Sequence, residues 1–179
     1  QVRTLVENLG TTPIRMEAVS TIALGCLVAP GIHDGGPRRH QWMLRAPRGE
    51  PLVDAATGRA PEGLARIHSH RHANQCGRGT LAATGHSTWT TDGELPAGVV
   101  TDRRSGRAIA WQVESDGPWR WELDARRDGT DSVSLVLSGP DDRHHAAARE
   151  IRAGEVFESV PASLAFSERG TPGALAALT

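Results

Sequence analysis

Three histidines at alternate positions are the residues of this chain whose spacing best suits chemistry. His68, His70 and His72 would project to one face of a strand, because successive side chains of a strand alternate between its two faces. Imidazole nitrogens are common zinc ligands, so this spacing permits a metal site. No carboxylate follows before Asp92, however, and arginines flank the histidines. We therefore expect a polar loop with no metal and no cofactor, and we keep a metal-dependent enzyme as an alternative.

Covalent and acid–base chemistry has less support in the sequence. No Gly-x-Ser-x-Gly nucleophile elbow is present, and only its nearness to His72 favours Cys76 as a nucleophile. Glu114 and Glu122 are predicted to be outward-facing strand residues, which are more often surface charges than a glycosidase pair held roughly 5 to 10 Å apart. We expect no catalytic residue within these 179 positions.

The tryptophans are the remaining candidates, because an exposed indole can stack on a sugar and a buried one fills a core. Trp111, Trp119 and Trp121 alternate with polar residues and share their strand faces with aliphatic ones, which favours burial. Trp42 and Trp89 lie in more polar surroundings and are expected to be more open. Those two are the candidate substrate-binding residues.

The elements that carry these residues are predicted to be strands. The segments 109–113 and 119–123 both have the two-residue period of a half-buried strand, and Ser115-Asp116-Gly117-Pro118 between them is typical of a turn. These features predict a hairpin, which the segment 132–137 would extend into a three-stranded meander. The segment 87–90 is a further expected strand, and the pair His144-His145 is expected in a loop.

Short strand patterns recur from Val2 onward, and only residues 173–179 favour a helix. Many short strands in one domain predict an all-β fold in which two antiparallel sheets pack face to face, with few or no helices. The apolar stretch 22–30 is far shorter than the roughly 20 residues that span a bilayer. The chain is therefore expected to be a single domain that does not cross a membrane.

Charge and cysteine content narrow the function classes. The 20 basic and 21 acidic residues give a net charge of -1, which lacks the excess positive charge of a nucleic-acid or anionic-membrane binder. Two cysteines, Cys26 and Cys76, are too few for a disulfide framework, so free thiols in a cytoplasmic protein are expected. The sequence starts at Gln1 in a strand-like pattern, which we interpret as a start inside a larger protein.

Four ordered motifs resemble those of glycoside hydrolase family 36 α-galactosidases. The segment WQVESDGPWRWEL, residues 111–123, resembles the family's WQIEHNGxWRWE, and residues 87–102 resemble SWSTGxxLPMGxLTD. Leu137-Ser138-Gly139-Pro140 with His144 resembles LSGPTxxxHxW, and residues 153–161 resemble PGExFTTVP. The stretch around His68 to His72 only echoes the family's Ser-Ser-His-x-His-Asn-Pro segment. The resemblance is to the domain that precedes the family's catalytic barrel.

This resemblance implies a galactose-mutarotase-like β-supersandwich over residues 1–173, with residues 174–179 starting the connection to a barrel. The family cleaves terminal α-galactosides with retention, using two aspartates of the barrel, and no residue of this chain matches their motifs. The expected partners are therefore the parent's barrel, a galactoside bound through the parent, and further copies in a homo-oligomer. The alternative is a stand-alone carbohydrate-binding module that uses its tryptophans.

Overall fold

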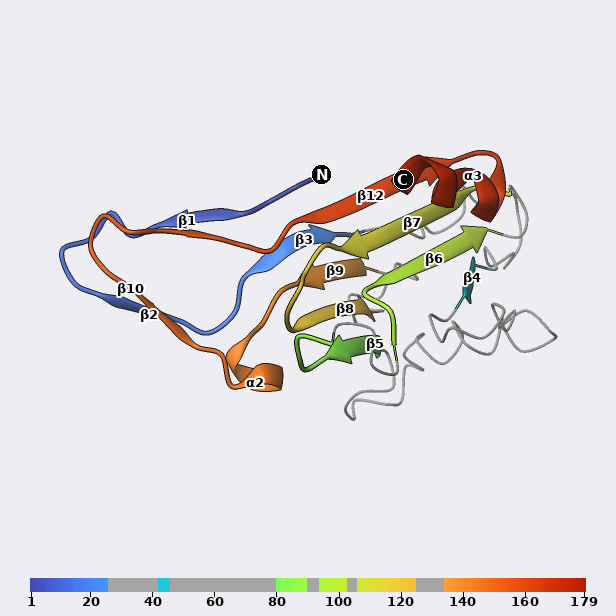
Figure 1. Ribbon diagram of the computed structural model, residues 1–179. Coiled ribbons are helices and arrows are strands. Elements are labelled where there is room, and N and C mark those ends of the chain that lie inside the picture. Colours follow the sequence, from blue (N-terminus) through green and yellow to red (C-terminus); the bar gives the residue numbers. More distant parts are fainter. Residues whose placement is uncertain (26–41, 46–79, 90–93, 103–105, 125–133) are drawn as a thin grey trace, which may run out of the picture.

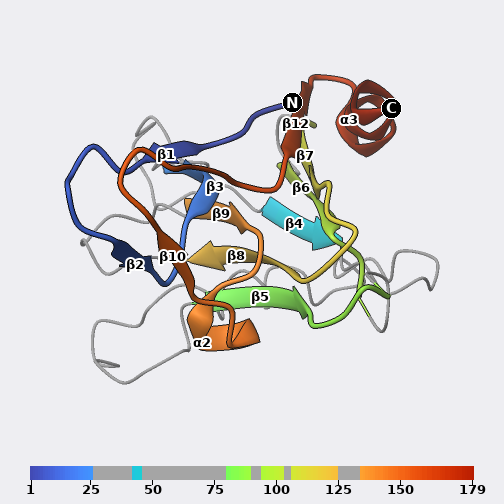
Figure 2. The ribbon, with the colours of Figure 1, turned by 60° about the vertical axis from the view of Figure 1, so that its left-hand side comes forward.

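Two four-stranded antiparallel sheets face each other in the computed structural model (Figures 1 and 2). The structure describes residues 1–25, 42–45, 80–89, 94–102, 106–124 and 134–179. The first sheet has the order β12 (Ala162–Ser167), β7 (Ala108–Val113), β6 (Ala97–Asp102), β4 (Trp42–Arg45). The second has the order β3 (Ser20–Leu24), β9 (Ser134–Ser138), β8 (Trp119–Asp124), β5 (Thr80–Gly85). The predicted all-β, two-sheet architecture is confirmed.

The predicted tryptophan hairpin is wrong, because β7 and β8 belong to different sheets. Strand β7 has β6 on one edge and β12 on the other, and β8 lies between β5 and β9. Hydrogen bonds from Val113 N to Pro96 O and from Glu114 N to Pro161 O keep both edges of β7 occupied up to the turn. Since no edge of β7 is free to pair with β8, the 115–118 turn carries the chain from one sheet to the other. The predicted pairing of β8 with β9 is confirmed.

The crossing places the tryptophans in the core between the sheets, as predicted. Trp111, Trp119 and Trp121 are 0%, 0% and 2% exposed, and they cluster with Leu123, Leu135 and other aliphatic side chains. The rings of Trp111 and Trp121 meet edge to face, with centroids 5.4 Å apart. Burial of about 150–250 Å² for each indole stabilises the fold by about 4–6 kcal/mol. That gain outweighs the roughly 1–3 kcal/mol cost of the Trp111 Nε1–H, which has no hydrogen-bond partner in the described part of the chain.

A glycine lies opposite two of the buried tryptophans in the neighbouring strand. Gly98 of β6 pairs with Trp111, and Gly85 of β5 pairs with Trp119. A Cβ atom added to either glycine would overlap the indole ring of its partner. Each ring therefore lies directly over the backbone of the adjacent strand, and this position requires glycine.

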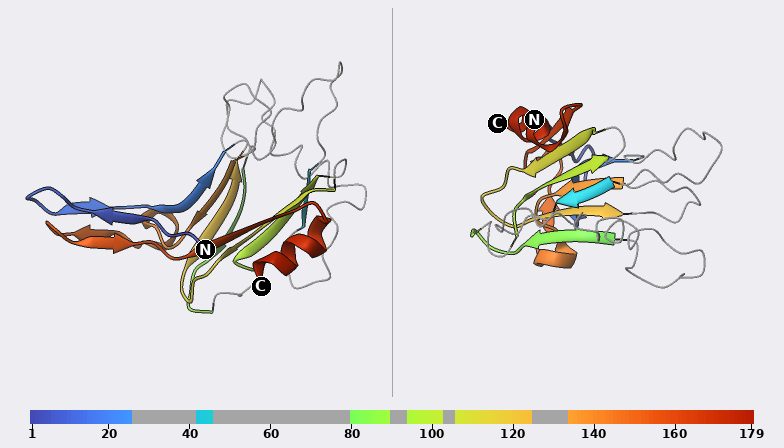
Figure 3. Two further views of the ribbon diagram at one scale, coloured as in Figure 1. Left: turned by 90° about the horizontal axis from the view of Figure 1, so that it is seen from above. Right: turned by 90° about the vertical axis from the view of Figure 1, so that its right-hand side faces the viewer.

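The outer face of the first sheet is covered by the helix α3 (Gly170–Leu178) (Figure 3). Ala174 is fully buried against small residues of the sheet, including Ala108, Ala110 and Ala165, and Leu178 packs on the same cluster. Small side chains on β7 and β12 let the helix lie close to the strands. The helix predicted near the C-terminus is thus present, and it starts at Gly170 rather than Gly173.

Four short strands form an arm that projects from the sandwich (Figures 1 and 3). In it β1 (Leu5–Glu7) pairs with β11 (Val156–Glu158), and β2 (Ile14–Met16) pairs with β10 (Arg149–Ile151). Strand β10 was not expected from the sequence, because Arg149-Glu150-Ile151 does not alternate between polar and apolar residues.

Asn8 holds the two halves of the arm together. Its side chain donates hydrogen bonds of 2.9 Å to the carbonyl oxygens of Thr12 and Ile151, and its Oδ1 accepts one from Gly10 N. Asn8 is 4% exposed and Ile151 is 0% exposed, so the arm has a small interior of its own. The turn that follows β1 therefore holds the β1–β11 pair and the β2–β10 pair together.

The strand predicted at 87–90 is wrong where the structure describes it. Residues 87 and 88 form a bend, and Trp89 N donates a hydrogen bond to Ser87 Oγ. This local serine turn replaces pairing with a neighbouring strand. Among the described residues, none of the helices has the length and apolar character needed to cross a membrane.

The contact between Gly98 and Trp111 predicts a sharp response to one added methyl group. Gly98→Ala should destabilise the fold by about 1–3 kcal/mol, because the indole has no room to move within a close-packed core. Urea denaturation followed by tryptophan fluorescence measures the change. Gly117→Ala is the matched control, since the nearest atom to its added Cβ would be 3.9 Å away. Equal stability of the two variants would contradict this account of the core.

Candidate functional site

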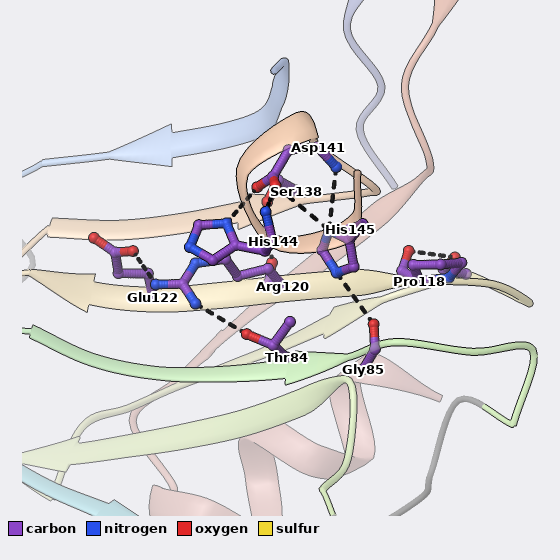
Figure 4. A network of polar contacts seen from close by, with 10 residues as sticks. Thr84, Gly85, Pro118, Arg120, Glu122, Ser138, Asp141, His144 and His145 are labelled. Atoms are coloured by element: carbon purple, nitrogen blue, oxygen red, sulfur yellow. Dashed lines mark hydrogen bonds and ion pairs between the residues drawn. The ribbon is translucent and has the colours of Figure 1, made fainter. Parts of the chain in front are cut away.

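A network of charged and polar side chains covers the outer face of the second sheet, beneath the short helix α2 (Asp142–His145) (Figure 4). Arg120 and Glu122 project from β8, and Ser138 projects from β9, on the side away from the tryptophans. The helix follows β9 directly through Gly139 and Pro140, so its side chains reach back over the ends of β8 and β9. This arrangement brings residues more than twenty positions apart into one cluster.

Asp141 positions the helix. It is the N-cap residue of α2: its Oδ1 accepts a hydrogen bond of 2.6 Å from His144 N, and its Oδ2 lies 2.8 Å from His144 Nδ1. Burial acts to raise the pKa of the Asp141 carboxyl, but the side-chain and backbone hydrogen bonds from His144 outweigh it, and the pKa lies below its ordinary value of 3.8. The carboxylate form is therefore part of the folded structure.

His145 joins the helix to strand β5. Its side chain is 1% exposed, its Nδ1 accepts a hydrogen bond from Asp141 N, and its Nε2 lies 3.2 Å from Gly85 O. A nitrogen that accepts from a backbone amide carries no proton, so Nε2 carries the hydrogen and donates it to the carbonyl. His145 is thus fully engaged in holding α2 on the sheet.

Arg120 and Glu122 form an ion pair on adjacent outward positions of β8. Arg120 Nη2 lies 2.6 Å from Glu122 Oε2, and Nη1 donates a 2.9 Å hydrogen bond to Thr84 Oγ1 on β5. The two side chains are only 17% and 24% exposed. Partial burial makes this pair stronger than an open surface pair and fixes the direction of both groups.

A cavity of about 170 Å³ opens between these groups and the start of β3. We call it the α2 pocket; its walls include Val19, Ser20, Arg120, Glu122, Ser138 and His144. The floor is formed by paired residues of β8 and β9, because Arg120 lies opposite Ser138 and Glu122 lies opposite Val136. The rim is held in place by the 3.1 Å ion pair between Arg15 and Asp142 and by the hydrogen bond from Asp142 N to Glu17 O.

The candidate residues predicted from the sequence do not gather at this pocket. Trp89 is 77% exposed, as expected, and lies outside the pocket lining. The backbone of Trp42 lies in β4 of the other sheet, and His68, His70 and His72 fall outside the described residues. Within the described ranges, no group of three or more histidine, cysteine, aspartate or glutamate residues could hold a metal ion.

The sequence predicted a loop at His144-His145, and this prediction is wrong. For that reason the site was not predicted. Both histidines lie on α2, a single helical turn that starts at the Asp141 cap. The signal was present as Asp141 three residues before His144, the spacing of a side-chain N-cap. A helix of four residues has no apolar period, so only its cap could have revealed it.

Comparisons with known proteins find solved structures of the same fold, at low sequence identity. No family model matches the sequence, and a search among curated proteins finds no match. Solved α-galactosidases of family GH36 do match: AgaB of Geobacillus stearothermophilus has a TM-score of 0.67 at 10% identity over 97% of this chain and 20% of its own. The chain shares its fold with part of these enzymes.

Two further structures agree with that match. AgaA of Geobacillus stearothermophilus has a TM-score of 0.66 at 10% identity, covering 97% of this chain and 20% of its own. The α-galactosidase from Lactobacillus brevis has a TM-score of 0.63 at 10% identity, covering 93% of this chain and 19% of its own. The chain therefore spans about a fifth of the length of these enzymes. The similarity suggested by the four motifs is confirmed at the level of the fold.

The Asp141 cap predicts a loss of stability on removal of its side chain. Asp141→Ala should destabilise the fold by about 1–2 kcal/mol, because two nitrogens of His144 lose their acceptor. Asp141→Asn retains one acceptor oxygen for His144 N and should cost less. Urea denaturation at neutral pH measures both variants, and Asp116→Asn, which removes an exposed carboxylate from the β7–β8 turn, is the matched control.

Acid should remove the advantage of the wild-type aspartate over asparagine. Because the pKa of Asp141 is lower in the folded than in the unfolded chain, its stabilisation is complete above the unfolded pKa and is lost as pH falls through the folded pKa. The stability difference between the wild type and Asp141→Asn should therefore shrink below about pH 4. A difference that stays constant across this range would rule out the carboxylate as its source.

Proposed function

We propose that this chain is the non-catalytic N-terminal domain of an α-galactosidase-like glycoside hydrolase. The observation that carries the proposal is the coverage of the structural match, which includes 97% of this chain but only 20% of AgaA or AgaB. A domain that occupies one fifth of a larger enzyme leaves room for a separate catalytic unit in the rest.

The residues of the family-like motifs support a structural role. Trp111 and Trp119 lie over Gly98 and Gly85, and Gly139 of the Leu-Ser-Gly-Pro motif lies against the side chain of Val160. Each of these residues contributes to the packing of the sandwich. Packing therefore accounts for this part of the motifs without any chemistry within this chain.

The carboxylates of the described residues also support an inert domain. A glycosidase acid needs a carboxyl whose pKa is raised toward neutrality. The hydrogen bonds from Ser163 and Gln1 instead hold the pKa of Glu114 below its usual value, and those from His144 do the same for Asp141. Neither of these two groups suits proton donation to a leaving sugar.

In the proposed setting, the domain packs against the parent's catalytic barrel and shapes the rim of its active site. The parent hydrolyses terminal α-galactosides with retention, and the domain meets substrate only through that rim. Contacts with further copies would support a homo-oligomer. The near-neutral charge and the two cysteines fit a cytoplasmic protein without nucleic-acid or membrane partners.

Activity assays test this proposal. The purified 179-residue chain should release no p-nitrophenol from p-nitrophenyl α-galactoside, because both catalytic aspartates are expected outside it. The product of a reading frame extended beyond Thr179 should contain a barrel and hydrolyse the same substrate with retention, as followed by NMR of the first-formed anomer. Hydrolysis by the 179-residue chain, or a frame that ends at Thr179, would contradict the proposal.

A carbohydrate-binding module is the second candidate, and the exposure of Trp89 favours it. The indole of Trp89 is 77% exposed, whereas the three tryptophans of the core are buried. A sugar can stack only on an exposed indole, and Trp89 provides one. Raffinose should then quench tryptophan fluorescence with saturation, and Trp89→Ala should abolish the effect. Quenching that is absent, or that persists unchanged in Trp89→Ala, would rule out Trp89 as the platform.

A further inference from the structure

We propose that the α2 pocket binds a single neutral hexose unit. This site differs from the exposed tryptophan, lies on the outer face of the second sheet, and is built from Arg120, Glu122, Ser138 and His144. The proposal rests on the size, charge balance and hydrogen-bonding groups of the pocket, and it does not depend on the proposed glycosidase setting.

The size of the pocket suits a small ligand. The volume of about 170 Å³ is many times the roughly 10–15 Å³ that one bound water molecule needs, so the pocket can hold more than a few waters. A single sugar ring is a ligand of that small size class. Drug-sized ligands occupy cavities of about 300–1,000 Å³, which is larger than this pocket.

The charges of the pocket are already paired. Arg120 is neutralised by Glu122 at 2.6 Å, and the carboxylate of Asp141 is satisfied by two nitrogens of His144. An anion would have to compete with Glu122 for the guanidinium, and a cation would have to compete with Arg120 for the carboxylate. A neutral ligand can use both groups without displacing either of them.

The hydrogen-bonding capacity that remains suits neighbouring hydroxyl groups. A guanidinium has five N–H donors, and the contacts of Arg120 with Thr84 and Glu122 each use one. Glu122 Oε1 and His144 Nε2 have no hydrogen-bond partner among the described residues. Each sugar hydroxyl both donates and accepts, so two adjacent hydroxyls could bridge the arginine and the glutamate.

Apolar groups line the same pocket. Ala18, Val19 and Val136 are among the lining residues, beside the charged side chains. A hexose presents C–H groups on its ring as well as hydroxyls at its rim, so it needs both kinds of surface. The pocket is also preorganised, because α2 is fixed by the Asp141 cap and by the contact of His145 with Gly85. Fixed groups lose little conformational freedom on binding.

Two-dimensional ¹H–¹⁵N NMR of the 179-residue chain tests this proposal, with galactose and glucose as the probes. We expect saturable shifts at Arg120, Ser138 and His144, with a Kd on the order of 1 mM for a single small ring. Inorganic phosphate and acetate serve as anion controls. Neither anion should produce saturable shifts at these residues.

Two variants locate the binding. Glu122→Gln keeps the shape of the side chain but removes its charge, and it should weaken binding about tenfold, the range lost with one charged hydrogen bond. Val136→Trp should fill the floor of the pocket and abolish binding. Glu168→Gln is the matched control, because Glu168 also forms an ion pair with an arginine but is 84% exposed and is not part of the pocket lining. Its Kd should equal that of the wild type.

The outcomes separate this proposal from its rivals. Unchanged binding in Glu122→Gln, in a variant whose spectrum is otherwise native, would overturn it, so the conclusion does not depend on the folding of Val136→Trp. Loss of binding in Trp89→Ala with retention in Glu122→Gln would place the sugar on Trp89 instead. Absence of saturable shifts with either hexose, or equal shifts with phosphate, would also overturn it. None of these results bears on whether a longer product hydrolyses α-galactosides.

Discussion

Trp111 and Trp121 belong to opposite sheets and meet edge to face in the middle of the sandwich, with ring centroids 5.4 Å apart. Ten positions separate them in the sequence, and the turn between them must bring the chain across the full gap between the sheets. The contact therefore fixes the spacing of the two sheets at one place. The indole rings that fill the space between the sheets lie directly over the backbone of the neighbouring strand. Gly98 and Gly85 are therefore required opposite Trp111 and Trp119, because a Cβ atom at either position would overlap the ring.

Most of the fold could be predicted from alternation, but the pairing of strands could not. The two-residue period of 109–113 and 119–123 located both strands correctly and predicted that the tryptophans are buried. The same pattern fits a hairpin in one sheet and a crossing between two sheets, since both bury one face of each strand. The choice between them depends on whether an edge of β7 is free to pair with β8. Both edges are occupied, one by β6 and the other by β12, and β12 lies about fifty positions after β7 in the sequence.

The polar site was harder to predict, for a related reason. Its parts come from β8, β9, α2 and the start of β3, and the sequence pattern of each part is ordinary by itself. Arg120 and Glu122 have the spacing of surface charges on a strand, and their sequence gives no sign that they share a pocket with His144. Only the Asp141 cap carried a local signal, and four residues are too few for periodicity to support it.

The partial burial of Arg120 and Glu122 changes the energetics of their ion pair. On an open sheet, neighbouring opposite charges contribute about 0–1 kcal/mol, because water screens them and both side chains must be held still. In this structure the two side chains are only 17% and 24% exposed, so their attraction grows, but part of their hydration is lost. The hydrogen bond to Thr84 offsets some of that loss for Arg120, while Glu122 Oε1 has no hydrogen-bond partner among the described residues. The remaining donors and acceptors of the pair are open to water, because Trp111 Nε1 is the one buried side-chain nitrogen or oxygen that lacks a partner in the described part of the chain. A ligand in the α2 pocket must therefore replace hydrogen bonds that water already makes, and hydroxyl groups can do so because each of them both donates and accepts.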